Sequence, residues 1–165
     1  MLVILSADEP ELISAARKLV RAHMFAGSTQ HSREEIESVV RRLPDPYVAP
    51  TGSLWVAMLD ETALGCVALQ EIAPGVSEMK RMYVRPEARG EGVGRQLTNH
   101  AIAYARLRGD EFMRLGTLST ALAAQHLYGS LGFQRIAPYR PLEFGETWFY
   151  ELRLREAMRP VPALT

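Results

Sequence analysis

Three runs rich in apolar and β-branched residues follow one another in the middle of the chain, at residues 54–59, 64–72 and 76–84. The joints between these runs are short and turn-like, Asp60-Glu61-Thr62 and Pro74-Gly75. Strand-like runs separated by such joints are typical of neighbouring antiparallel strands. The centre of the chain is therefore predicted to form an antiparallel meander.

On both sides of this meander the apolar residues recur at helical spacing. Asp8 with Glu11, and Ser32 with Glu35, form capping-box patterns ahead of apolar stripes, so two helices are expected before the meander. The other expected elements are an edge strand at 3–5, helices at 93–109 and 121–131, and strands at 112–118, 133–136 and 147–154. A strand, a helix and a further strand in sequence imply a parallel pair with a right-handed crossover. We therefore predict an α/β (α+β) fold with a mixed, mostly antiparallel sheet of six to seven strands and about four helices.

Length and composition limit the class of protein. The chain has 165 residues, of which 47% are hydrophobic, and this size suits one domain, predicted at 1–155 with a frayed tail at 156–165. The 19 basic and 19 acidic residues balance, which argues against a nucleic-acid-binding surface. A single cysteine fits a reducing compartment, and no apolar run is long enough to cross a bilayer. A cytoplasmic protein without nucleic-acid or membrane partners is expected.

A glycine-rich segment joins the end of the meander to the following helix. It reads Arg89-Gly90-Glu91-Gly92-Val93-Gly94-Arg95. Glycines let successive backbone N–H groups turn toward one anion, and the positive end of a helix dipole lies behind them. The segment therefore predicts a diphosphate cradle, the alternative being a glycine-rich turn with solvated arginines. It lacks the ending of a P-loop and the spacing of the dinucleotide fingerprint.

At this point the chain resembles the GNAT superfamily of acetyl-CoA-dependent N-acetyltransferases. Residues 78–95, with Arg89, Gly92 and Gly94, are similar to its motif A, and Tyr128 with Gly132-Phe133 is similar to its motif B. The resemblance covers residues 54–136 well and fades over the first 50 residues. It implies a β-bulge that splays two parallel strands, so that the pantetheine arm of acetyl-CoA lies between them.

The resemblance also assigns residues to the cofactor. Met82, Tyr83 and Val84 would contact acetyl-CoA through the strand, with backbone groups of Met82 and Val84 facing the pantetheine amides and the thioester. Arg89, Gly90, Glu91, Gly92, Val93, Gly94 and Arg95 would hold the diphosphate. Strict alternation along residues 76–84 leaves neither face cleanly polar, which a bulge explains and which an imperfect amphipathic strand explains equally.

Two side chains are candidates for catalysis. Glu78 can accept the proton of the amine directly or through water, or it can be a solvated charge paired with Lys80 or Arg81. Tyr128 matches the tyrosine that protonates the departing sulfur in the family, or it is a core aromatic of its helix. The resemblance further implies that the Val84 N–H stabilises the developing oxyanion.

Two positions depart from the family pattern. Ala121 stands where many relatives place an asparagine that contacts pantetheine, so that contact is absent or comes from elsewhere. Leu115-Gly116-Thr117 lacks the acid that a related subgroup carries at the middle position. Any role for an acid at that place is lost here.

The acceptor amine is expected between the first two helices and the loop before the last strand. Candidate wall residues are Phe25, Tyr139, Arg140, Phe144 and Trp148, and Arg140 is a candidate ligand for an acceptor carboxylate or a solvent-facing arginine. The predicted activity is acetyl transfer to a small, amino-acid-like amine by direct attack in a ternary complex. Alternatives are a protein or peptide N-acetyltransferase and a non-catalytic acetyl-CoA sensor. No metal site is expected, and a homodimer is compatible with the exposed strand edges.

Overall fold

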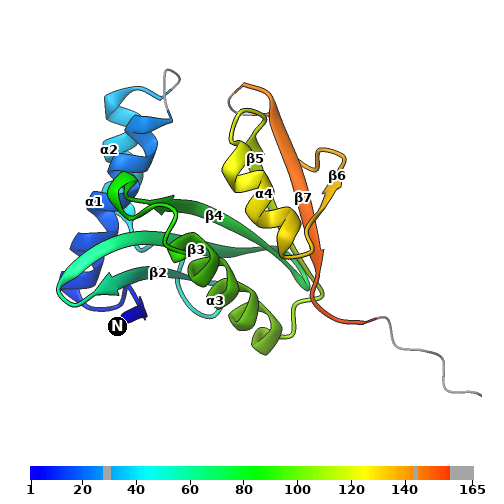
Figure 1. Ribbon diagram of the computed structural model, residues 1–165, viewed down its shortest axis with the longest axis horizontal. Coiled ribbons are helices and arrows are strands. Elements are labelled where there is room, and N and C mark those ends of the chain that lie inside the picture. The colour runs from blue at the N-terminus through cyan, green and yellow to red at the C-terminus, as the bar shows by residue number, and fades with distance from the viewer. Residues whose placement is uncertain (28–30, 143–144, 157–165) are drawn as a thin grey trace, which may run out of the picture.

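One seven-stranded sheet carries helices on both faces in the computed structural model, which describes residues 1–27, 31–142 and 145–156 (Figure 1). The strand order is β1-β2-β3-β4-β5-β7-β6, with β4 and β5 parallel and every other pair antiparallel. The elements are β1 (Leu2–Ser6), α1 (Pro10–Ala26), α2 (Arg33–Arg42), β2 (Gly52–Leu59), β3 (Thr62–Ala73), β4 (Val76–Val84), a short 3₁₀ turn (Pro86–Ala88), α3 (Val93–Arg108), β5 (Phe112–Leu118), α4 (Leu122–Ser130), β6 (Gln134–Ile136) and β7 (Thr147–Arg153). The predicted fold class, with its meander and parallel pair, is confirmed. Residues 157–165, most of the predicted tail, lie outside the described ranges.

The first two helices begin differently from one another. Ser32 caps α2 through the predicted capping box, because its hydroxyl accepts from the Glu35 N–H and Glu35 accepts from the Ser32 N–H. The box predicted for α1 is wrong: its N-cap is Glu9, without a side-chain cap, and Pro10 occupies the first turn. Proline suits that position, since it has no N–H to satisfy and its φ is already helical.

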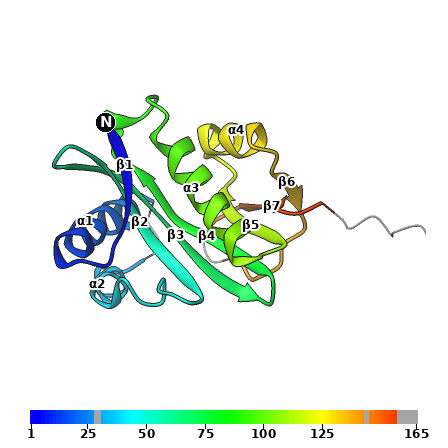
Figure 2. The ribbon, with the colours of Figure 1, turned by 90° about the horizontal axis from the view of Figure 1, so that it is seen from below.

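Two apolar cores lie on opposite faces of the sheet. Helices α1 and α2 cover one face and α3 and α4 the other, as Figure 2 shows from below. The first core surrounds fully buried residues such as Leu19, Ile36 and Val56, and the second surrounds Trp55, Leu97 and Met113. The central strands are therefore buried on both sides, and functional groups on them are reached only where the sheet opens.

The sheet opens between β4 and β5. These strands pair over only three positions, Val76–Glu78 with Phe112–Arg114, and their remaining residues are not paired to each other. Short pairing at one end lets the strands diverge toward the other end. The splayed parallel pair implied by the family resemblance is therefore present.

A bulge in β4 lies directly beyond the paired segment. Cys66 of β3 is opposite Tyr83, but Ala68 is opposite Lys80, so β4 has one extra residue here. Arg81 has φ +56°, a left-handed conformation that few side chains adopt. Met79 and Met82 consequently face the same core although they are three residues apart, and Tyr83 packs against the other core. The bulge that the mixed strand pattern suggested is confirmed.

Candidate active site

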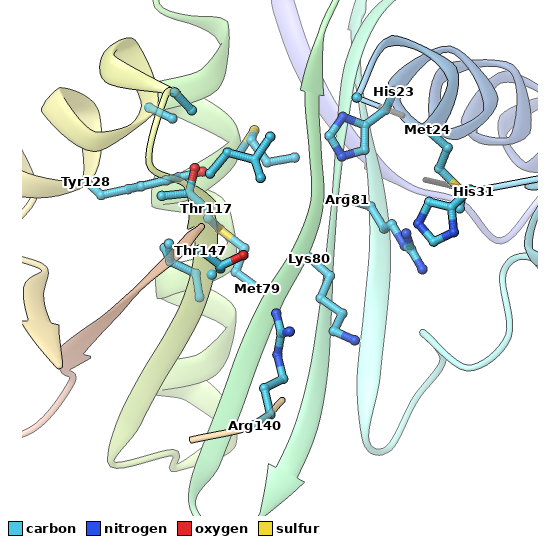
Figure 3. A pocket seen from close by; sticks show the side chains of 17 residues that line it. His23, Met24, His31, Met79, Lys80, Arg81, Thr117, Tyr128, Arg140 and Thr147 are labelled. Carbon is cyan, nitrogen blue, oxygen red and sulfur yellow. The ribbon is translucent and has the colours of Figure 1, made fainter. Parts of the chain in front are cut away.

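A cavity of about 360 Å³ occupies the gap between the splayed strands (Figure 3). Its wall comes from the end of α1, the bulge of β4, the second half of β5, the start of α4 and the chain before and within β7. The lining residues are His23, Met24, Gly27, His31, Met79, Lys80, Arg81, Met82, Leu115, Gly116, Thr117, Leu118, Ala121, Ala124, Tyr128, Arg140 and Thr147. Segments far apart in the sequence therefore meet at this one place.

The described part of the cavity wall is cationic. Lys80, Arg81 and Arg140 line it, and no aspartate or glutamate belongs to the part of the wall that the structure describes. Two imidazoles, His23 and His31, complete this side. Burial, together with the charges of Arg81 and Arg89, lowers the pKa of His23 to about 4, so His23 is neutral near pH 7. The cationic wall therefore favours binding of an anionic group in the cavity.

Glu78 lies behind this wall rather than on it. Only 1% of the residue is exposed, and it is absent from the cavity lining. Its carboxylate accepts a short hydrogen bond from the Tyr139 hydroxyl and one of 3.1 Å from the Arg140 Nε, and it lies 3.3 Å from the Lys80 ammonium. Burial, followed by the contact with Glu78, raises the pKa of Tyr139 above its ordinary value. Glu78 thereby fixes two of the three cations around the cavity.

Tyr128 faces the cavity from α4. The residue is buried, its ring packs at 5.7 Å from the Phe133 ring, and burial raises the pKa of its hydroxyl well above the ordinary value. Among residues 1–27, 31–142 and 145–156, no group donates to or accepts from this hydroxyl. The ring is therefore part of the core, as one of the two sequence interpretations expected, and the residue also lines the cavity, which leaves the catalytic interpretation a prediction.

The glycine-rich segment forms the start of α3. Gly92 is the N-cap, and both Gly90 and Gly92 have φ +81°. A Cβ at either position would meet no atom within 4 Å, so backbone conformation and not space explains these two glycines. An open turn followed by the N-terminus of a 16-residue helix suits a diphosphate.

The two arginines of this segment are held by the protein. The Arg89 Nε donates to the Val84 carbonyl at 3.0 Å, and the Arg95 guanidinium donates to the Ser130 hydroxyl of α4 at 2.8 Å. Arg89 also lies over the Tyr83 ring, with its guanidinium carbon 5.8 Å from the ring centre. Of the three predicted strand residues, Met82 lines the cavity, Val84 packs toward α3, and Tyr83 turns to the opposite face.

Of the residues predicted for the acceptor wall, Arg140 is the one that lines the described part of the cavity. Phe25 is 46% exposed and does not line the cavity. It lies on a different face of α1 from its neighbour Met24, which is buried and does line the cavity. Tyr139 lies behind the wall on Glu78, and Trp148 packs under Arg135, whose guanidinium carbon is 3.6 Å from a ring centre. Phe144 lies outside the described residues.

Several lining residues were not predicted. His23, Met24 and His31 come from the part of the chain where the family resemblance fades, and nothing local marks them. Lys80 and Arg81 had a usable signal, since two adjacent cations between Met79 and Met82 in a central strand require a special environment.

Comparison with known proteins gives the family to which the chain belongs. Residues 16–133 match the acetyltransferase (GNAT) family, and the chain belongs to this family. It spans 66% of the length of one curated relative that it matches and 36% of the length of another.

Two relatives and one solved structure show what the chain is similar to. An uncharacterized N-acetyltransferase of Schizosaccharomyces pombe is 42% identical over 112 residues, 67% of this chain and 66% of that protein. N-acetylaspartate synthetase of Danio rerio is 38% identical over 108 residues, 64% of this chain but only 36% of that protein. An aminoglycoside 6'-N-acetyltransferase solved with coenzyme A has a TM-score of 0.74 at 14% identity, covering 95% of this chain and 99% of the other, which shows the shared fold.

Two further observations concern the described part of the chain. None of its helices has the length and hydropathy that a bilayer span requires. No group of three or more His, Cys, Asp or Glu side chains there is placed to hold a metal ion.

Proposed function

We propose that this protein transfers the acetyl group of acetyl-CoA to the primary amine of a small acceptor that carries a carboxylate. The observation behind the proposal is the cationic cavity at the gap between β4 and β5, where Lys80 and Arg140 lie beside the position expected for the thioester. Similarity to a relative named for acetylated aspartate supports the same acceptor class. A carboxylate gains most from an arginine, which can bind it through two parallel hydrogen bonds.

The residues present fit the coenzyme. Gly90, Glu91, Gly92, Val93 and Gly94 provide an open turn and a helix N-terminus for the diphosphate, with Arg89 and Arg95 at its sides. Met82, Tyr83 and Val84 continue the strand along which the pantetheine arm would extend. Acetyl-CoA supplies the acetyl group, and the chain aligns it with the amine in a ternary complex, which replaces an encounter in solution by a positioned contact.

Proton removal from the amine is assigned to Glu78 through water. Because Glu78 is behind the wall and already accepts from Tyr139 and Arg140, an ammonium in the cavity does not reach its oxygens directly. A water between the amine and the carboxylate connects them, and a positioned general base contributes about 10²–10⁴-fold to a rate.

Stabilisation of the charges that develop on the thioester oxygen and on the sulfur is assigned to Val84 and Tyr128. The Val84 N–H stabilises negative charge on the thioester oxygen, a contact that is typically worth about 3 kcal/mol. The Tyr128 hydroxyl gives its proton to the departing sulfur. Its raised pKa keeps that proton in place near pH 7 until the thiolate forms.

A thiol-release assay with acetyl-CoA tests the proposal. The acceptor panel contains L-aspartate, L-glutamate, L-asparagine, amines without a carboxylate, and short peptides. Release should be fastest with the carboxylate-bearing amino acids. Preference for peptides would indicate a protein acetyltransferase, and binding of acetyl-CoA without release on any acceptor would indicate a sensor; either result overturns the proposal.

A further inference from the structure

Gly116 is a glycine because of the space around it. It lies within β5 and lines the cavity, and it does not have a positive φ. A Cβ built there would be 2.9 Å from the Arg140 Nη2, 3.1 Å from the Phe149 Cε1 and 3.2 Å from the Thr147 Cγ2. The atom that a side chain would meet first is therefore the tip of the Arg140 guanidinium.

Arg140 reaches this place under several constraints. Its Nε donates to Glu78 at 3.1 Å, and its guanidinium carbon is 5.1 Å from the centre of the Phe149 ring. The side chain keeps 28% of its surface exposed, and it lines the cavity. Glu78 and Phe149 hold the guanidinium from behind and from the side, and the missing side chain at 116 leaves the room that it occupies.

We propose that Gly116 is a specificity-determining residue of the acceptor site, because it lets the Arg140 guanidinium lie across β5 and present its charge to an acceptor carboxylate. This inference rests on the proposed function and deepens it. Any larger residue at 116 moves the guanidinium and reduces the preference of the cavity for amines that carry a carboxylate. The residue at position 116 of β5 thus decides whether the Arg140 charge can face the substrate carboxylate.

A second cation reinforces the argument. The Lys80 ammonium lies 3.3 Å from the same carboxylate that holds Arg140, and Figure 3 shows the Lys80 and Arg140 side chains near one another at one end of the cavity. Lys80 stays in place when Arg140 moves, since it belongs to β4. Displacement of Arg140 should therefore weaken carboxylate binding without abolishing it.

The variant Gly116→Ala tests the inference. We expect the KM for L-aspartate to rise about tenfold, the change in affinity that corresponds to about 1.4 kcal/mol. The value of kcat should stay within about twofold and the KM for acetyl-CoA should not change, since the approach is to a side-chain tip. Gly129→Ala is the matched control, because a Cβ at Gly129 meets no atom within 4 Å.

The double variant with Arg140→Gln separates displacement of the guanidinium from general damage to β5. Arg140→Gln alone should raise the KM for L-aspartate, and adding Gly116→Ala to it should change that KM no further. The inference is overturned if Gly116→Ala matches Gly129→Ala, if its effect persists in the Arg140→Gln background, or if Arg140→Gln alone changes nothing. Each of these results is read on variants of a wild-type protein that releases thiol with carboxylate-bearing amino acids, whereas the proposed function fails when the wild-type protein prefers peptides or releases no thiol.

Discussion

The proposed cofactor side and the proposed acceptor side of the site are built in different ways. The proposed cofactor residues other than Tyr128 lie within residues 82–95, where a strand, a turn and a helix N-terminus follow one another. The acceptor wall combines the end of α1, residue 31, the β4 bulge, β5 and residues 140 and 147. A contiguous segment depends on backbone geometry that the sequence encodes locally, whereas an assembled wall depends on the packing of the whole fold. Variants on the two sides should accordingly fail in different ways.

Replacement of Glu78 should give the largest effect. Glu78→Gln removes the proposed proton acceptor while keeping its shape, and we expect kcat/KM for the acceptor to fall about 10³-fold near pH 7. The deficit should shrink as pH rises, because an acceptor that is already neutral needs no base. A pH–rate profile checks this. If only the acceptor KM rises, with an unchanged profile, Glu78 holds Arg140 and Tyr139 in position and takes no proton.

Tyr128→Phe should have the next largest effect, on the cofactor side. Loss of the proposed proton donor to sulfur should lower kcat about 10²-fold, while calorimetry shows wild-type affinity for acetyl-CoA. The phenyl ring retains the packing against Phe133, so the melting temperature should change little. Wild-type kcat in this variant would restrict Tyr128 to the core.

Gly92→Ala tests the cradle itself. The positive φ of Gly92 makes alanine strained there, at about 1–3 kcal/mol of stability. We expect the KM for acetyl-CoA to rise about tenfold, equivalent to about 1.4 kcal/mol, with the acceptor KM unchanged. Gly129→Ala, whose Cβ also meets open space but without a positive φ, is the control. An increase in the acceptor KM alone would contradict the assignment of Gly92 to the cofactor side.

His23 should give the smallest effect, on stability rather than rate. Its pKa is about 4 in the folded protein and about 6.5 when exposed, so the unfolded chain binds the proton more readily. Stability contributed by neutral His23 is present above pH 6.5 and is lost as pH falls toward 4, up to about 3 kcal/mol. His23→Gln should flatten denaturant-unfolding stability across this window. His126→Gln on the exposed side of α4 is the control and should leave the pH dependence unchanged.

The contrast between the two sides also explains what the sequence could predict. Strand and helix positions and the parallel pair follow from hydrophobic period, turn residues and the order of the elements, and they are present. The bulge is also present, but the strand pattern left it open and the family resemblance implied it. The glycines at 90 and 92 were identified because their conformational freedom is a property of the residue itself.

The acceptor wall could not be predicted in the same way. The chemistry of Arg140 marks it as a candidate ligand for a carboxylate. Its partner Glu78 is 62 positions away, and no neighbouring residue indicates that the two side chains are in contact. Phe25 and Trp148 have the bulk of wall residues, but the periodicity of their own elements turns them elsewhere. In the sequence, Gly116 stands out only for the acid it lacks, since the position of the guanidinium above it depends on the packing of β7.

The extra residue in β4 decides which side chains of this strand face each of the two helix layers. Beyond Arg81, every side chain of the strand points to the face opposite to the one that simple alternation would give. A regular strand through the same residues would turn Tyr83 toward α3 and Val84 toward α1, whereas deletion of Arg81 would remove the extra residue and leave both side chains on their present faces. The bulge, and not the chemistry of the side chains, decides which of them faces α3.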